Sequence, residues 1–88
     1  MTIGEPRVVL FSRPGCHLCD DARVVVEAVT SELGHSFVEC DITADPGDPV
    51  QAARYAAYRD AIPVVTVDGV QVDFWRISAD RLRAALGA

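Results

Sequence analysis

Residues 7–19 read RVVLFSRPGCHLC, and the fold expected for this 88-residue chain follows from them. Residues 7–11 form a short, apolar run rich in β-branched side chains, which predicts a strand buried on both faces. The turn-forming residues 12–15 end this strand. Cys16 and Cys19 follow at once, where a helix is expected to begin. The stretch therefore predicts a strand that delivers a cysteine pair to the start of a helix.

Apolar residues recur at three- and four-residue steps beyond this point and predict an amphipathic helix. They are Leu18, Ala22, Val25, Val26, Val29 and Leu33. Gly34 offers a left-handed stop, and residues 36–42 then alternate as a second strand, with Val38, Cys40 and Ile42 on its interior face. Strand, helix and strand within residues 7–42 predict a parallel pair joined by a right-handed crossover.

The second half of the chain reads as a helix, a hairpin and a helix. Asp48 can cap the first of these helices, with Gln51 reaching back as its capping-box partner. The pair Asp68-Gly69 favours the tight turn of a hairpin within residues 62–74, and Ser78 can cap the last helix. We therefore expect an α/β fold in the order βαβ-α-ββα, with one domain over residues 1–88.

Composition excludes several classes of partner. Thirteen acidic residues against eight basic ones, all of them arginine, give a net charge of −5 and no basic field that would attract phosphates, so nucleic acid is not expected as a partner. Residues 1–6 lack the basic start and apolar stretch of a signal peptide, and no run approaches the roughly 20 apolar residues of a membrane helix. We expect a cytoplasmic monomer with no membrane attachment.

The close cysteine pair carries the expected chemistry. Three cysteines cannot form the even-numbered disulfide framework of a small secreted protein, and the cytosol keeps structural thiols reduced. Free amides and the helix macrodipole stabilise a thiolate at a helix start, which predicts Cys16 as a nucleophile. Cys19, one turn further on, is then placed to attack the mixed disulfide formed at Cys16 and to release a reduced substrate.

A metal-binding role is the alternative interpretation of the same pair, because C-x-x-C is also half of many zinc sites. No second C-x-x-C and no paired histidine follows, and the further candidate ligands are His17, His35 and Cys40. We expect no metal at the site, and we expect Cys40 to be a small buried residue of the core. The alternative remains a redox-inactive or metal-binding adaptor that uses the surface near Ile62-Pro63 for docking.

Residues 11–19, FSRPGCHLC, and residues 61–65, AIPVV, together resemble glutaredoxins and thioredoxins, and most of all short bacterial glutaredoxin-like proteins with a C-H-L-C site. The resemblance covers nearly the whole chain. It implies a thioredoxin-like fold of the glutaredoxin type, with a four-stranded mixed sheet flanked by three helices and with Pro63 in the cis form beside the dithiol. It also implies a thiol-disulfide oxidoreductase that needs no metal or organic cofactor and takes electrons from glutathione or a dithiol reductase. Its substrates would be disulfides or glutathionylated thiols.

Three further residues are candidates for contact with the substrate. Many glutaredoxins carry a basic residue where Arg13 lies; its guanidinium can favour the thiolate or hold a substrate carboxylate, or it can be a solvated loop arginine. His17 can modulate the thiol by its charge or stand in solvent without effect. Ile62 precedes a proline at a strand start, so its amide and carbonyl can pair with an extended peptide or with glutathione.

One departure from the glutaredoxin pattern bears on the electron donor. Dithiol glutaredoxins carry a Gly-Gly pair after the hairpin, where backbone amides approach glutathione, and this chain has Asp73-Phe74 at that place. A carboxylate there would repel an anionic ligand, and the bulky ring would block the amides. The departure predicts slow turnover with glutathione.

Overall fold

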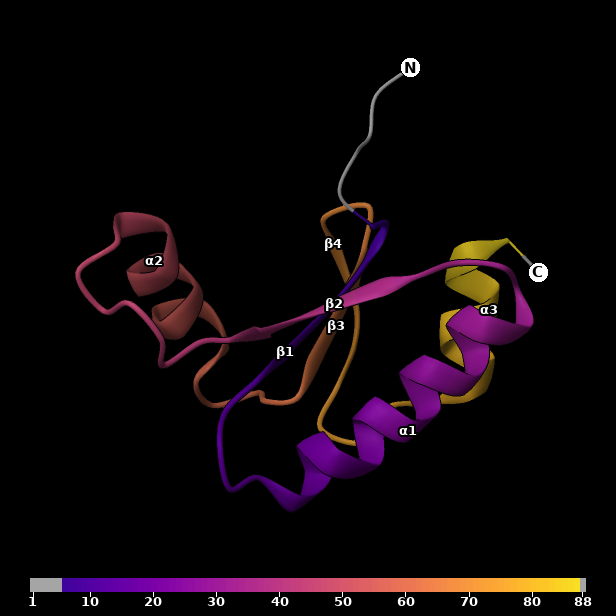
Figure 1. Cartoon of the computed structure of the whole chain (residues 1–88), viewed down its shortest axis with the longest axis horizontal. Coiled ribbons are helices and arrows are strands. Elements are labelled where there is room, and N and C mark those ends of the chain that lie inside the picture. The colour runs from indigo at the N-terminus through magenta and orange to yellow at the C-terminus, as the bar shows by residue number, and fades with distance from the viewer. Residues whose placement is uncertain (1–5, 88) are drawn as a thin grey trace.

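The computed structural model describes residues 6–87. Its elements, in chain order, are β1 (Val8–Ser12), α1 (His17–Glu32), β2 (Phe37–Asp41), α2 (Pro49–Tyr58), β3 (Val64–Val67), β4 (Val70–Phe74) and α3 (Ala79–Leu86) (Figure 1). The expected order βαβ-α-ββα, with four strands in one mixed sheet and three helices, is confirmed.

The sheet has the strand order β2-β1-β3-β4. β1 lies parallel to β2 and antiparallel to β3, so that Val8 is paired with Phe37 on one side and with Val67 on the other. β3 and β4 form the expected hairpin, and the turn residues Asp68 and Gly69 both have positive φ, of 53° and 83°. Two positive φ values in succession are what a type I′ turn requires. The apolar first strand is therefore an inner strand, as its sequence predicts.

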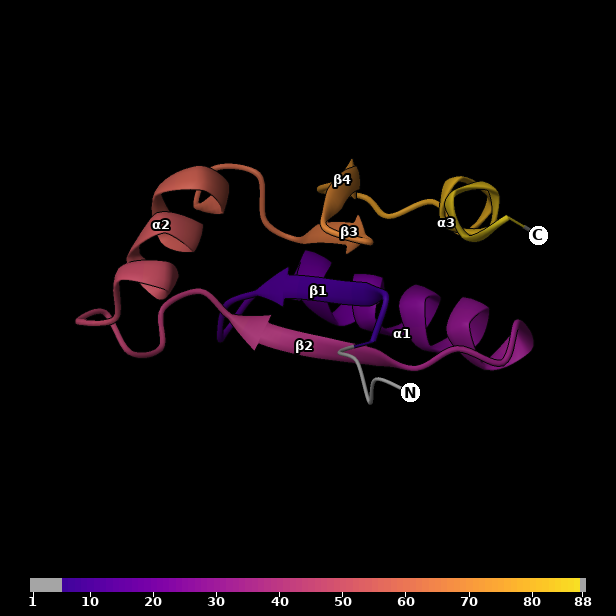
Figure 2. The ribbon, with the colours of Figure 1, turned by 90° about the horizontal axis from the view of Figure 1, so that it is seen from above.

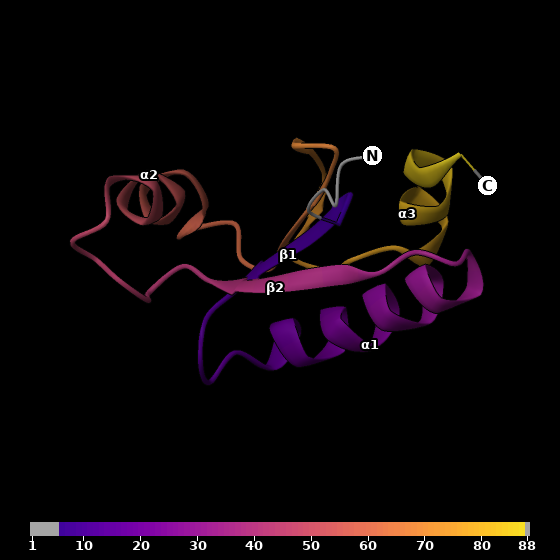
Figure 3. The ribbon, with the colours of Figure 1, turned by 45° about the horizontal axis from the view of Figure 1, so that its top comes forward.

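α1 runs along one face of the sheet with α3 beside it (Figure 3). The main apolar core lies between these helices and the sheet, and its fully buried members include Val8, Leu10, Val26 and Leu82. A second apolar cluster gathers around the carboxyl end of β1 and comprises Phe11, Cys19, Ile42, Ile62 and Val64. The end of the sheet that bears the cysteine pair thus has its own apolar packing.

α2 stands apart from this layer, at the opposite end of the molecule from α3 (Figure 2). None of its residues is buried. It is tied to the sheet by Tyr58, whose ring centroid lies 4.7 Å from that of Phe11, and by Arg54, whose guanidinium lies 5.5 Å from the centre of the Phe11 ring. The sheet is therefore covered unevenly by its three helices.

The interior face expected for residues 36–42 is only partly correct. β2 is an edge strand. Val38 is 46% exposed, because α2 lies apart from the sheet and does not cover it. Cys40 is half-buried, and its sulfur lies 3.4 Å from Oε1 of Gln51 and 3.5 Å from Nη1 of Arg54. Ile42 alone is fully buried as expected. Alternation shows which residues share a face, but it does not show what covers that face.

The capping residues behave mostly as their local sequence predicts. Asp48 caps α2 through the amide of Val50, and Ser78 caps α3 through the amide of Arg81. Gln51 does not complete a capping box, because its side-chain amide donates instead to the carbonyls of the loop at Asp41 and Ala44. Among residues 6–87, no helix has the length and apolar character needed to cross a membrane.

Candidate active site

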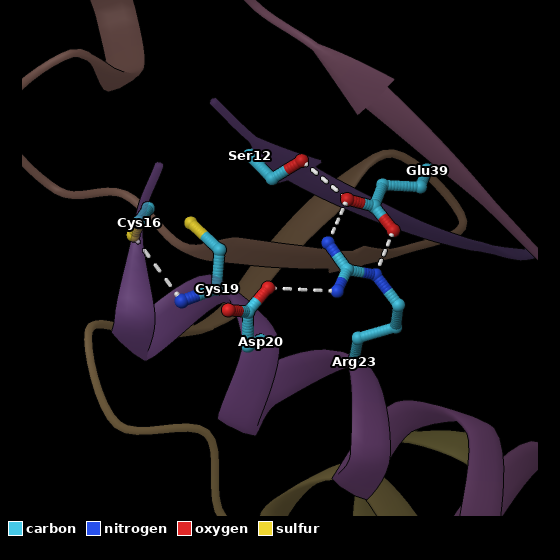
Figure 4. Close-up of polar contacts among 6 residues, drawn as sticks. All are labelled: Ser12, Cys16, Cys19, Asp20, Arg23 and Glu39. Carbon is cyan, nitrogen blue, oxygen red and sulfur yellow. Dashed lines mark hydrogen bonds and ion pairs between the residues drawn. The ribbon is translucent and has the colours of Figure 1, made fainter. Parts of the chain in front are cut away.

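Cys16 occupies the N-cap position of α1. Gly15, with φ of 73°, lets the chain turn out of the loop that follows β1, and Cys16 then has extended backbone with φ of −102° and ψ of 113°. Its Sγ accepts a hydrogen bond of 3.2 Å from the amide of Cys19 (Figure 4). A sulfur thus takes the acceptor role that Ser, Asp or Asn usually fills at a helix start. This sulfur is half-exposed at the positive end of the helix.

Cys19 has a different environment one turn further on. Its side chain is 1% exposed and packs in the apolar cluster with Phe11 and Ile62. Burial raises the pKa of Cys19 to about 12, and its contact with Cys16 adds to the effect, while the nearby Arg13 acts in the opposite direction. At neutral pH, Cys19 is therefore held as a protonated thiol. Neither cysteine is in a disulfide.

A polar network lies next to the pair and joins three elements (Figure 4). Ser12 donates to Glu39 at 2.7 Å, and Arg23 reaches Glu39 through Nη2, also at 2.7 Å, and Asp20 through Nη1 at 2.9 Å. The Arg23 guanidinium holds the pKa of Glu39 below its usual range, against the opposing effect of burial. The network ties α1 to the end of β1 and the middle of β2, close to the helix start that carries the cysteines.

Sequence reasoning did not find this network. The spacing of Asp20 and Arg23 is a signal for a helix-surface ion pair, and it was available. The contacts of Glu39 with Ser12 and Arg23 have no such signal, because they depend on the parallel register of β1 with β2, in which Leu10 is opposite Glu39.

Ile62 and Pro63 lie where β3 begins, and the peptide bond between them is cis, as the resemblance implies. Both side chains are buried, and Ile62 shares the apolar cluster of Cys19. The carbonyl of Pro63 accepts a 2.8 Å bond from the amide of Trp75. Within residues 6–87, the amide and carbonyl of Ile62 have no hydrogen-bond partner, so neither group is used by the sheet or its connections.

A groove with a volume of about 420 Å³ begins at this point. Its lining residues are Leu18, Ile62, Asp73, Phe74, Trp75, Arg76 and Arg81. Leu18 stands between the two cysteines in sequence, and Phe74 and Trp75 are 41% and 54% exposed. The groove therefore connects the surroundings of the cysteine pair with an exposed aromatic surface.

Asp73 does not act as the sequence suggests. Its side chain is 3% exposed, and its carboxylate accepts hydrogen bonds from the amides of Phe74, at 2.9 Å, and Ser78, at 2.7 Å. Arg81 adds an ion pair at 3.4 Å. The carboxylate is therefore turned inward and bonded within the protein, and does not face a ligand as the expected repulsion assumed. The amide of Phe74 donates to the Asp73 carboxylate, so this donor is occupied by a side chain and not blocked by the Phe74 ring as expected.

The structure brings Cys16, Cys19, Ile62 and Pro63 into one neighbourhood. Arg13 lies in the loop before Cys16 and His17 is the first residue of α1, and both are exposed. No ion pair holds either side chain among the residues that the structure covers. In the same part of the chain, no three His, Cys, Asp or Glu side chains gather into a group that could hold a metal ion.

Comparison with known proteins agrees with this arrangement. The model of the family described as glutaredoxin-like domain (DUF836) matches residues 7–87. The uncharacterized protein Rv0508 of Mycobacterium tuberculosis is 32% identical over 84 residues, which cover 93% of this chain and 84% of that protein.

Two solved structures extend the likeness to the fold. A structural genomics target protein from X. campestris has a TM-score of 0.68 at 31% identity, and the match covers 90% of this chain and 93% of that one. The glutaredoxin of Archaeoglobus fulgidus has a TM-score of 0.66 over 97% of this chain and 90% of its own, and at 13% identity it shows the fold alone.

Proposed function

The chain belongs to the glutaredoxin-like domain (DUF836) family, and from this premise we propose that it is a thiol-disulfide oxidoreductase with Cys16 as nucleophile and Cys19 as resolving thiol. The observation that carries the proposal is the asymmetry of the pair. Cys16 is half-exposed at the N-cap of α1, and Cys19 is buried one turn behind it with its amide bonded to the Cys16 sulfur. One sulfur is open to a substrate, and the other is close and protected.

The reaction proceeds in two exchanges. The thiolate of Cys16 attacks one sulfur of a substrate disulfide, forms a mixed disulfide and expels the other substrate sulfur, which takes up a proton. Cys19 then gives up its proton and attacks the Cys16 sulfur, so that an intramolecular disulfide forms and the second substrate thiol leaves. The dithiol loses two electrons to the substrate, which also takes up two protons, one from Cys19 and one from solvent. A glutathionylated thiol enters the same sequence.

The substrate backbone pairs with the amide and carbonyl of Ile62, at the step made by Pro63. Arg13 and His17 stand exposed on the approach to Cys16, where Arg13 can hold a carboxylate of the substrate and His17 can modulate the thiol by its charge. The reaction takes place in the cytoplasm, where thiols are kept reduced.

The oxidised dithiol is reduced by glutathione or by a dithiol reductase, and the reaction needs no metal or organic cofactor. Slow turnover is expected with glutathione. The amide of Phe74 is bonded to the Asp73 carboxylate, and the amide of Trp75 is bonded to the carbonyl of Pro63. These two donors are therefore not available for the carboxylates of a small ligand.

The experiment that tests the division of labour compares Cys16→Ser with Cys19→Ser in the full chain. Cys16→Ser abolishes all exchange, because the attacking thiol is gone. Cys19→Ser traps mixed disulfides with protein substrates and retains reduction of glutathionylated thiols, which needs only the attacking thiol. Mass spectrometry of the trapped species and a glutathione-coupled assay measure the two outcomes, with Cys40→Ser as the matched control.

Equal residual activity in Cys16→Ser and Cys19→Ser would contradict the assignment of roles. Stoichiometric zinc in the purified reduced protein, lost in both variants and kept in Cys40→Ser, would favour the metal-binding adaptor instead.

A further inference from the structure

Two exposed aromatic side chains stand on the rim of the groove. Phe74 and Trp75 are 41% and 54% exposed, and their ring centroids lie 5.1 Å apart in an edge arrangement. Aromatic side chains are enriched at protein interfaces because they contribute large contact areas, and a contiguous exposed apolar surface marks an interaction site. Here that surface adjoins Ile62, which lines the same groove and whose amide and carbonyl have no hydrogen-bond partner within residues 6–87.

Trp75 is fixed in place although its ring is exposed. Its φ of 61° is in the left-handed region, which is strained for a bulky side chain and persists only where the surroundings impose it. Its amide donates to the carbonyl of Pro63 at 2.8 Å, and its indole nitrogen donates to the carbonyl of Asp60 at 3.1 Å. A ring held in this way loses little conformational entropy when a partner binds.

The charge of the rim is opposite to that of the molecule. Arg76 and Arg81 line the groove, although the chain carries a net charge of −5. Arg76 has no ion pair within residues 6–87, and Arg81 is 71% exposed while touching Asp73 at 3.4 Å. Since the Asp73 carboxylate is buried and shared with two amides, it leaves most of the Arg81 guanidinium free for a partner. Guanidinium groups in such a setting select carboxylates.

The same rim favours a long ligand over a small one. The amides of Phe74 and Trp75 are occupied, so a small anion finds no backbone donors there. An extended segment can instead pair with the backbone of Ile62, lie on the aromatic rings and place acidic side chains at Arg76 and Arg81. All of these residues line one groove.

We propose that this groove is the docking surface for an extended acidic segment of a protein, and that this segment carries the disulfide which Cys16 attacks. The inference rests on the proposed function for the chemistry and names the substrate class of that same site. Phe74 and Trp75 bind the apolar part of the segment, and Arg76 and Arg81 bind its carboxylates.

Binding can be measured apart from chemistry, because Trp75 is the only tryptophan of the chain and its emission reports on the groove. The reduced protein is titrated with three peptides that carry serine in place of cysteine, flanked by acidic, neutral or basic residues, and with reduced glutathione. The acidic peptide is expected to shift the Trp75 emission in a saturable way, and the basic peptide and glutathione are expected to leave it unchanged over the same range.

Arg76→Gln is expected to weaken binding of the acidic peptide by roughly three- to fivefold, which is the size of one exposed ion pair. Added salt is expected to weaken binding of the same peptide to the unmodified protein to a similar extent. Arg7→Gln is the matched control, because it removes the same charge at the far end of β1, where Arg7 pairs with Asp68, and it leaves binding unchanged. A fivefold weakening is a change of about 1 kcal/mol in binding free energy.

Equal binding of the acidic and basic peptides, equal effects of Arg76→Gln and Arg7→Gln, or binding of glutathione as tight as that of the acidic peptide would overturn the inference. Reduction of a small neutral disulfide by the unmodified protein is measured in parallel. Its failure together with a preference for acidic peptides would remove the proposed function and leave only the docking surface, whereas its success with no preference for acidic peptides would leave the proposed function standing and remove the inference.

Discussion

At the scale of single residues, Cys16 and Cys19 show how one helical turn separates two thiols chemically. The N-cap position leaves the first sulfur half in solvent and against a backbone amide. The fourth position of the same turn faces the sheet, so the second sulfur is enclosed by Phe11, Ile62 and their neighbours. The difference arises because Cys16 is the N-cap residue, with extended backbone outside the helix, whereas Cys19 lies within the first turn and packs in the apolar cluster.

The buried thiol predicts how the stability of the reduced protein depends on pH. Burial raises the pKa of Cys19 from 9.0 to about 12. Between these values the unfolded chain releases the proton that the folded chain keeps, so raising the pH favours the unfolded chain. The contribution of this group is fully present below pH 9 and is lost as the pH rises towards 12.

Urea unfolding of the reduced protein at about pH 8 and about pH 10 measures this effect as a fall in the free energy of unfolding. Cys19→Ala removes the part of the fall that belongs to this thiol, and Cys16→Ala serves as the control for cysteine loss. If Cys19→Ala shows the same fall as the unmodified protein, the thiol is not held protonated by the fold.

At the scale of elements, Asp73 joins β4 to α3. One carboxylate oxygen accepts the amide that follows it, and the other accepts the amide of Ser78 at the start of the helix, so the connection between strand and helix is closed by a single side chain. The side chain is almost fully buried. The element boundary thus depends on a charged residue in a place where glycines were expected from the resemblance.

Asp73→Ala is expected to lower the free energy of unfolding by about 1 to 3 kcal/mol, because it removes the acceptor of two part-buried amide hydrogen bonds. Asp73→Asn retains one acceptor oxygen and costs less. Urea unfolding in a reducing buffer measures both, with Asp60→Ala as the control, since the Asp60 side chain is 92% exposed. A cost for Asp73→Ala no larger than that for Asp60→Ala would show that the two amides find other partners.

The elements also show which features a sequence can predict. Helix starts at Cys16, Asp48 and Ser78 and the turn at Asp68-Gly69 depend on neighbours within a few residues, and all were expected. β2 is an edge strand, and the burial of its residues depends on where α2 packs. The exposure of Val38 and the half-burial of Cys40 are examples. No local pattern encodes the position of α2.

The candidate site divides in the same way. The cysteine pair and the Ile62-Pro63 step follow from motifs within the sequence. The inward turn of Asp73 and the left-handed backbone of Trp75 do not, because each is imposed by groups brought together by the fold, such as the carbonyl of Pro63. Neither has a signal in the residues beside it.

At the scale of the whole molecule, burial is distributed unevenly. α1 buries Cys19, Ala22, Val26, Val29 and Thr30, and α3 buries Leu82 and Leu86, whereas α2 buries no residue. Local stability follows buried apolar contact, so the helices are expected to differ in how readily they open.

Amide hydrogen exchange is therefore expected to be faster in α2 than in α1 and α3 under native conditions. α3 has eight residues against the ten of α2, so slower exchange in the shorter helix would show that burial and not length sets the order. The measurement is exchange followed by mass spectrometry or NMR at constant pH. Protection of α2 equal to that of α1 would contradict the expectation.

The strand order has a consequence for synthesis on the ribosome. β1 is made first, but its antiparallel partner β3 is made only after α2, and residues 8 and 67 must meet for the sheet to close. Until then, one edge of β1 has no partner strand. Phe11 also lacks the apolar contacts that Ile62 and Val64 provide in the folded protein. Pairings between such distant segments form slowly, and an open strand edge invites association with other chains. The emerging chain is thus most in need of chaperone protection between the synthesis of α1 and that of β3.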